Sequence, residues 1–347
     1  MLTIHDPDEK KKKSVPKSPQ KKKQKEKRKT RLQSKYLNSG VKKCFIIGLV
    51  EDLPERYHNV KTLLDLLDLN SIRHHLTCDM KLQNVLCGLQ GHSSSYPCIY
   101  CTGKKPWDGP GDVRTLGGIK EQVRKFQNAP NSKKIPKDFF NCVNPPLIEG
   151  DDEDRIIDIL PLPELHLLLG VTNTLLFKVN ELAGDDLVIK WANGLSCYQE
   201  KQGSKQFNGE RCVILLNNME SLIKKLPRKL KFFGYALKAF NQVRKSCFGE
   251  ELDGDYREKI AEFESAFRDI GLDLQPVTPK VHVVLHHLAD FVDENGPLGQ
   301  FNEQTFESVH YAFANHMDTS KYTRNLDHPE HGKFLKKGVI DYNTLRI

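Results

Sequence analysis

Two pairs of metal-binding side chains, far apart along the chain, constrain its fold more than any other feature. Cys98 and Cys101 form a Cys-x-x-Cys motif, and His282 and His287 are separated by four residues. Two thiolates and two imidazoles at such spacings are a donor set that tetrahedral Zn²⁺ accepts in structural sites. A shared metal would require the long segment between the pairs to bring its two ends together.

Spacings of this kind also arise by chance in a chain with nine cysteines and thirteen histidines, and His286 competes with His287 as the second imidazole ligand. The odd number of cysteines and the absence of a signal-peptide pattern at the start lead us to expect a reducing compartment. There a Cys-x-x-Cys motif indicates a metal or redox site before a disulfide.

The net charge of +8 is concentrated at the start of the chain. Residues 1–31 carry thirteen Lys and Arg against four Asp and Glu, whereas the remaining residues carry 40 and 41. Residues 1–40 are too charged and too poor in apolar side chains to pack, which predicts a disordered tail. Two lysine clusters in this tail indicate a nuclear-import signal with non-specific affinity for nucleic acid, so we expect a nuclear location. A tail that is merely solvated is the alternative.

Apolar periodicity predicts strands early in the ordered region and helices after it. Residues 44–50 form a compact apolar run typical of a buried strand, and residues 72–78 are a plausible second strand that ends at Asp79. Apolar spacings of three and four predict helices over 59–67, 81–91, 119–126, 164–177, 185–195, 211–225, 228–248, 255–270, 278–293 and 302–315. No apolar run is long enough to cross a bilayer, so we expect no membrane contact.

The order and spacing of these residues resemble the catalytic core of Transib transposases and the V(D)J recombinase. Asp79 stands nineteen positions before Cys98, and Glu307 stands twenty positions after His287. Residues 162–170 also resemble the family's Leu-His-x-x-x-Gly segment. The resemblance covers roughly residues 42–320, and it is more specific than either ligand pair alone.

This resemblance implies a DDE-type, RNase H-like fold that is truncated at its N-terminus. The expected class is α/β plus a large α-helical insertion, which is an incomplete RNase H-like core with a zinc-binding, mostly helical insertion domain. The expected parts are a disordered basic tail at 1–40, a partial RNase H-like core at 41–97, a zinc-binding helical insertion at 98–295, and a C-terminal helix and tail at 296–347.

The resemblance also implies roles for individual residues. Asp79 and Glu307 correspond to the second and third catalytic acids, which hold Mg²⁺ or Mn²⁺ during DNA strand cleavage or transfer. The structural zinc would be shared by Cys98, Cys101, His282 and His287. The family's first catalytic Asp has no counterpart here, so we expect a catalytically incomplete protein.

The resemblance further implies DNA as a partner, a possible homodimer and no small-molecule substrate. Two alternatives to a transposase-derived protein remain. One is a non-catalytic, zinc-stabilised scaffold that binds DNA or protein. The other is a plain helical interaction protein without a metal.

Overall fold

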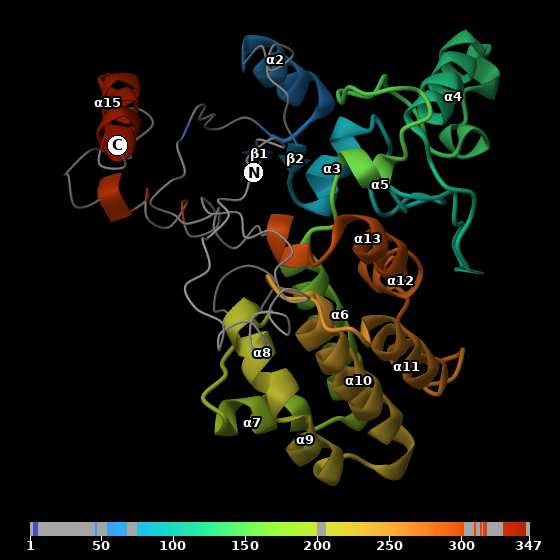
Figure 1. Ribbon diagram of the computed structural model, residues 1–347, viewed down its shortest axis with the longest axis vertical. Helices are drawn as coiled ribbons and strands as arrows, with labels where there is room; N and C mark the ends of the chain where they lie inside the picture. Colours follow the sequence, from blue (N-terminus) through green and yellow to red (C-terminus); the bar gives the residue numbers. More distant parts are fainter. Residues whose placement is uncertain are drawn as a thin grey trace, which may run out of the picture.

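The apolar stretch that begins at Glu164 forms the longest helix of the described structure, α6 (Glu164–Ala183). In the computed structural model this helix runs through the middle of the part formed by residues 164–301, which we call the helical half (Figure 1). Leu167, Val171 and Leu175 recur along it at helical spacing and are fully buried. The helices that pack against it are α7 (Leu187–Gly194), α8 (Gly209–Asn217), α10 (Lys231–Cys247) and α12 (Pro279–His286).

The structure describes most of the chain, and Figure 1 draws the remainder as a thin grey trace. The described residues are 3–5, 46, 54–67, 75–107, 109–199, 206–301, 309, 313, 315–317 and 329–344. Within these ranges, no helix combines the length and the apolar character that a membrane span requires.

Two segments predicted as single helices are each divided in the structure. The predicted helix over 211–225 is interrupted at Asn218, between α8 and α9 (Met219–Lys225). The predicted helix over 278–293 is interrupted at His287, between α12 and α13 (Leu288–Asn295). The remaining elements of the helical half are η6 (Arg228–Leu230), α11 (Tyr256–Arg268) and η7 (Leu298–Phe301).

The preceding part of the chain, residues 54–163, contains short elements joined by long loops, and we call it the loop-rich half. The helices predicted over 59–67, 81–91 and 119–126 are confirmed, with altered ends. The elements here are α2 (Tyr57–Leu67), β2 (His75–Thr77), α3 (Met80–Leu86), α4 (Leu116–Asn128), η4 (Asn131–Lys133), η5 (Pro136–Phe139) and α5 (Ile156–Ile159).

The predicted α/β, RNase H-like core was wrong, because the described structure is mostly helical. Its one ladder is antiparallel and joins β1 (Thr3–His5) to β2, with three residues in each strand. So short a ladder cannot form the layer on which an α/β fold is built. β1 also places three residues of the expected disordered tail in a strand. The strand predicted over 44–50 lies outside the described residues apart from Ile46.

Ile46 has its backbone groups paired by a side chain from the far end of the chain. Its N–H donates to Oδ1 of Asn343 at 2.9 Å, and its carbonyl accepts from Nδ2 of Asn343 at 2.8 Å. Asn343 belongs to α15 (His331–Thr344). The amide side chain therefore satisfies the two groups that a neighbouring strand would otherwise pair. Most of the helix predicted over 302–315 lies outside the described residues.

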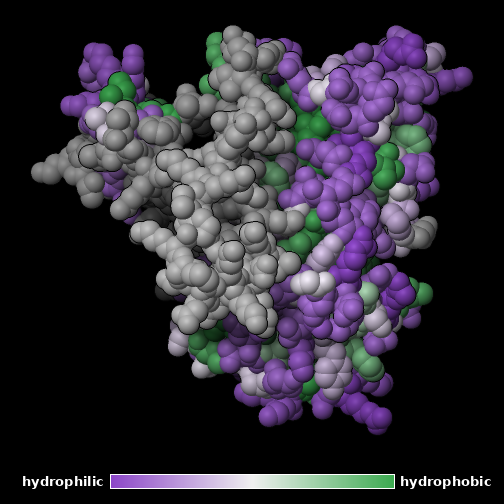
Figure 2. Space-filling model, viewed as in Figure 1, coloured by the Kyte–Doolittle hydropathy of each residue, from purple (hydrophilic) through white to green (hydrophobic). Residues whose placement is uncertain are grey.

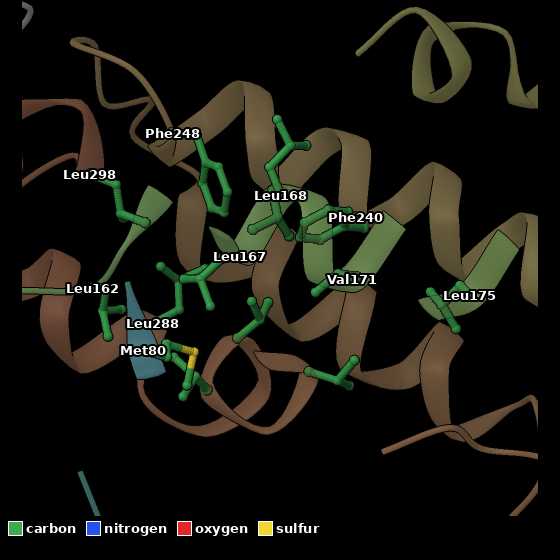
Figure 3. Packing of buried hydrophobic residues seen from close by; sticks show 14 of the residues in the cluster. Met80, Leu162, Leu167, Leu168, Val171, Leu175, Phe240, Phe248, Leu288 and Leu298 are labelled. Atoms are coloured by element: carbon green, nitrogen blue, oxygen red, sulfur yellow. The ribbon is translucent and has the colours of Figure 1, made fainter. Parts of the chain in front are cut away.

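One continuous hydrophobic core joins the two halves of the molecule. Figure 3 shows Met80 of α3 packed near Leu288 of α13 and Leu162, beside buried residues of α6 and α10. Because α3 contributes directly to this core, its position is fixed relative to the helices that follow α6.

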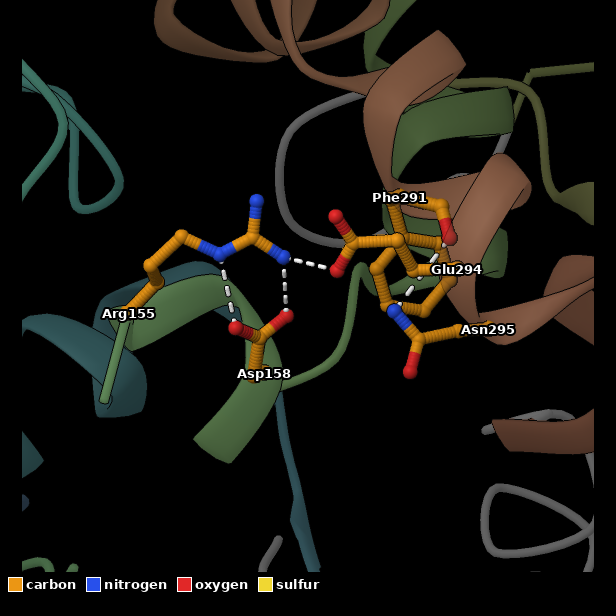
Figure 4. Close-up of polar contacts among 5 residues, drawn as sticks. All are labelled: Arg155, Asp158, Phe291, Glu294 and Asn295. Atoms are coloured by element: carbon orange, nitrogen blue, oxygen red, sulfur yellow. Dashed lines mark hydrogen bonds and ion pairs between the residues drawn. The ribbon is translucent and has the colours of Figure 1, made fainter. Parts of the chain in front are cut away.

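An arginine ties α5 to α13. Arg155, at the start of α5, bonds both carboxylate oxygens of Asp158 at 2.7 Å and also pairs with Glu294 of α13 (Figure 4). The hydrogen bonds that Arg155 donates to Asp158 raise the pKa of Arg155, so the guanidinium stays charged. The bidentate contact with Asp158 orients the guanidinium, and the pair with Glu294 helps to hold α13 beside the loop-rich half.

Gly170 allows α12 to approach α6 closely. A Cβ atom built at Gly170 would lie 2.8 Å from the Cβ atom of Lys280 and 2.1 Å from its Cδ atom. A clash with an atom near the backbone of α12 is not relieved by rotating a flexible side-chain end. Gly170 therefore sets the distance between these helices, although glycine weakens a helix interior.

We expect Gly170→Ala to lower the free energy of unfolding by about 1–3 kcal/mol, because overpacking outweighs the gain in helix propensity. Gly194→Ala is the matched control, since a Cβ there meets nothing within 4 Å. Urea unfolding of both variants measures the difference. A Gly170→Ala protein as stable as the control would show that the two helices are free to move apart.

Candidate metal centre

The two cysteines are fully buried at the start of a hairpin-like loop. Cys101 and Val113 form an isolated antiparallel β-bridge, and the N–H of Arg114 donates to the carbonyl of Tyr100 at 2.9 Å. Cys98 and Cys101 are both 0% exposed. The short spacing and the paired return segment hold the two sulfur atoms on one side of the loop.

The two histidines are placed by the start and the end of α12. The Thr278 side chain accepts the Val281 N–H at 3.3 Å, which caps the helix, and Pro279 occupies its first turn. In an unbroken helix, positions five apart point about 140° away from each other. Because α12 ends at His286, His287 leaves the helical path and its ring can turn toward His282.

The four predicted ligands meet. Their ligand atoms all lie within 4.8 Å of one another. The Cys98 Sγ to His287 Nε2 distance is 3.4 Å, and the Cys101 Sγ to His282 Nε2 distance is 3.3 Å. A zinc tetrahedron with bonds of about 2.3 Å to sulfur and 2.0 Å to nitrogen has S···N edges of roughly 3.5 Å. These two S···N separations fit the edges of such a tetrahedron.

The electrostatics of the cluster also favour a cation. A hydrogen bond with Cys98, and further ones with His282 and His287, hold the pKa of Cys101 well below its usual value, whereas burial raises the pKa of Cys98. Burial lowers the pKa of His282, which favours the neutral imidazole. A thiolate and neutral imidazoles are the forms that bind metals, and a bound cation supplies the charge that deprotonates the second thiol.

Aromatic side chains enclose the cluster. Trp107 stacks on His282 with ring centroids 4.1 Å apart, and its indole N–H donates to the Val277 carbonyl at 3.0 Å. Tyr100 meets His287 edge to face, and its hydroxyl donates to Gln83 at 2.9 Å. These contacts fix the planes of both imidazoles and limit the access of water.

A buried arginine organises the backbone of the cysteine loop. Nε of Arg114 donates to the carbonyls of Cys98 at 3.2 Å and Cys101 at 3.0 Å, and one terminal nitrogen donates to the Phe140 carbonyl at 2.9 Å. Only 4% of Arg114 is exposed. Its rigid fork of donors therefore satisfies carbonyls that would otherwise be buried without partners.

The structure describes one of the two predicted catalytic acids. Asp79 is the N-cap of α3, where its Oδ1 accepts the Leu82 N–H at 2.7 Å. Glu307 lies outside the described residues. Across the described ranges, the cysteine and histidine cluster is the one group of three or more side chains suited to a metal. The expected Mg²⁺ or Mn²⁺ site therefore has no support in the described structure.

No family model matches the chain, and no curated protein matches it in sequence. What the centre can do follows from its own donors and their surroundings. Several of these surroundings gave no signal in the sequence, because Arg114 and Trp107 reach the cluster from loops of irregular length and Gln83 reaches it from α3. No periodic pattern in the sequence marks Arg114 as a residue that contacts the Cys-x-x-Cys motif.

We expect Arg114→Lys to lower the free energy of unfolding by about 2–3 kcal/mol, because a single ammonium cannot replace the fork of donors. Arg124→Lys on the exposed face of α4 is the matched control and should change stability by less than about 0.5 kcal/mol. Denaturant unfolding monitored by circular dichroism measures both. Equal effects of the two variants would contradict the role assigned to Arg114.

Proposed function

We propose that this chain is a zinc-stabilised helical scaffold with a binding function, derived from a transposase but not itself cleaving DNA. The observation that carries the proposal is the convergence of two thiols and two imidazoles in one buried cluster. Cys98, Cys101, His282 and His287 would hold Zn²⁺, which supplies folding energy by joining the cysteine loop to the end of α12.

The proposed zinc is structural because four protein ligands complete its coordination. Catalytic zinc sites keep one position open for water or substrate, whereas structural sites are closed. His287, the most accessible of the four ligands, is only 7% exposed. The aromatic side chains of Tyr100 and Trp107 further separate the cluster from solvent.

The kinship with Transib transposases rests on the spacing of the ligands, and their convergence supports it. It does not rest on an RNase H-like core, which the described residues lack. The capping role of Asp79 supports a binding function over a catalytic one, because the N-terminus of α3 accounts for this acid. DNA is the proposed partner, and the basic tail at residues 1–40 is a proposed nuclear-import signal.

Purified protein should contain about one zinc ion per chain, and His287→Ala should lose it with a large fall in stability. His286→Ala is the matched control, because His286 is adjacent in sequence but lies outside the cluster. Elemental analysis after dialysis and thermal unfolding give the two readouts. Tetrahedral Co²⁺ absorption bands that need Cys98 and Cys101 would report the thiolate ligands.

Two outcomes would contradict the zinc proposal. One is wild-type protein with almost no zinc after purification from zinc-containing medium. The other is a Cys98→Ser variant whose stability and metal content equal those of the wild type.

Incubation with supercoiled DNA and Mg²⁺ or Mn²⁺ should give no nicking above background for wild type and Asp79→Asn alike. This substitution keeps the α3 cap, since Asn caps about as well as Asp, and removes only the carboxylate charge. Asp79→Ala should cost about 1 kcal/mol of stability instead. Metal-dependent nicking that Asp79→Asn abolishes would show that the protein is an enzyme.

A further inference from the structure

A second surface, distant in sequence from the zinc ligands, combines positive charge with exposed aromatic rings. It lies where α9 ends and α10 begins, at the lower end of the molecule in Figure 1, and the same end is largely hydrophilic in Figure 2. We call it the basic–aromatic patch, and it comprises Lys224, Lys225, Arg228, Lys229, Lys231, Phe232 and Tyr235.

The charge of this patch is not balanced locally. Residues 221–249 contain eight Lys and Arg and no Asp or Glu, although the chain after residue 31 is close to neutral. Glu220, the acid just before this segment, is already paired with Lys238. Among the described acidic side chains, none forms an ion pair with the five patch cations.

Helix electrostatics explain only two of these cations. Lys224 and Lys225 lie in the last turn of α9, where the helix dipole stabilises positive charge. Arg228, Lys229 and Lys231 lie at the entry to α10, where the same effect is unfavourable. Stability of the fold therefore gives no reason for three cations at this position.

The aromatic rings of the patch are not needed by the core. Phe232 is 43% exposed and Tyr235 is 47% exposed, whereas Phe233 between them is fully buried. The two exposed rings are three positions apart, on one face of α10, and meet edge to face with centroids 6.4 Å apart. Exposed rings beside unpaired cations indicate a surface that contacts a ligand.

Close packing holds the two halves of the patch together. A Cβ atom at Gly234 would lie 2.4 Å from Cγ1 of Ile223, so glycine permits α9 and α10 to touch. The end of α9, with its two lysines, is therefore held against α10, the helix that carries the two rings. The patch is a preformed surface of the folded protein.

We propose that the basic–aromatic patch binds single-stranded nucleic acid, with the cations contacting phosphates and Phe232 and Tyr235 stacking on bases. Aromatic rings contribute to binding of single strands because unpaired bases expose their faces. Duplex DNA and anionic lipid offer charge to the cations but no free base to the rings. This inference rests on the proposed binding function and names the surface and the class of partner.

The test measures binding of the full-length protein to a fluorescent oligothymidylate over a range of salt concentrations. Replacing both Phe232 and Tyr235 by Leu keeps apolar surface but removes the rings, and should weaken binding by at least about fivefold. Replacing Arg228, Lys229 and Lys231 by Gln should reduce the slope of log affinity against log salt by about 2.

The matched charge control replaces Lys133, Lys134 and Lys137 by Gln, near η4 and η5 on the other half of the molecule. This control should leave the affinity and the salt slope much closer to those of the wild type. The basic tail at residues 1–40 is present in every variant and therefore does not affect the comparison. Zinc content and thermal unfolding of each variant should match wild type, which separates this proposal from the zinc proposal.

Each of three results would overturn the inference, provided that the zinc content of the variants equals that of the wild type. The ring variant could bind oligothymidylate as tightly as wild type. The control triple variant could weaken binding as much as the patch variant. Phosphatidylserine vesicles could bind in a patch-dependent way while oligothymidylate does not, which would assign the surface to membranes.

Discussion

The meeting of two thiols and two imidazoles inside the protein is the interaction on which the described structure depends. Buried polar groups are costly unless they are paired, so the core can enclose this cluster only if its members satisfy one another or share a metal. The cysteine loop belongs to the loop-rich half, and the histidines belong to the helical half. Their contact therefore fixes how the two halves meet.

The geometry of the centre is set where helices begin and end. Thr278 and Pro279 start α12, Gly170 lets this helix lie close to α6, and the break at His287 turns the second imidazole inward. On the opposite side, Arg114 holds the cysteine carbonyls. A continuous helix through His287 would direct the two rings to different faces, and the site would not form.

Charge serves different purposes in different parts of the molecule. The thiols of the candidate metal centre are enclosed, and Asp79 caps a helix. The basic–aromatic patch instead exposes cations and rings that stability does not require. The proposed scaffold function rests on this contrast between an enclosed candidate metal centre and an exposed, charged surface.

The sequence by itself determined the types and spacing of the ligands, with His286 and His287 as competitors, and most of the helices, because donor spacing and apolar periodicity are local properties. It misled on fold class, since an apolar run at 44–50 and a carboxylate after 72–78 suggested an α/β core, whereas the described residues form one two-stranded ladder and are mostly helical. Tertiary structure showed that His287 rather than His286 joins the cysteines, and it alone brought Arg114 and Trp107 to the centre and left Phe232 exposed. These outcomes depend on where packing ends a helix and which distant segments touch, and no short stretch of sequence contains that information.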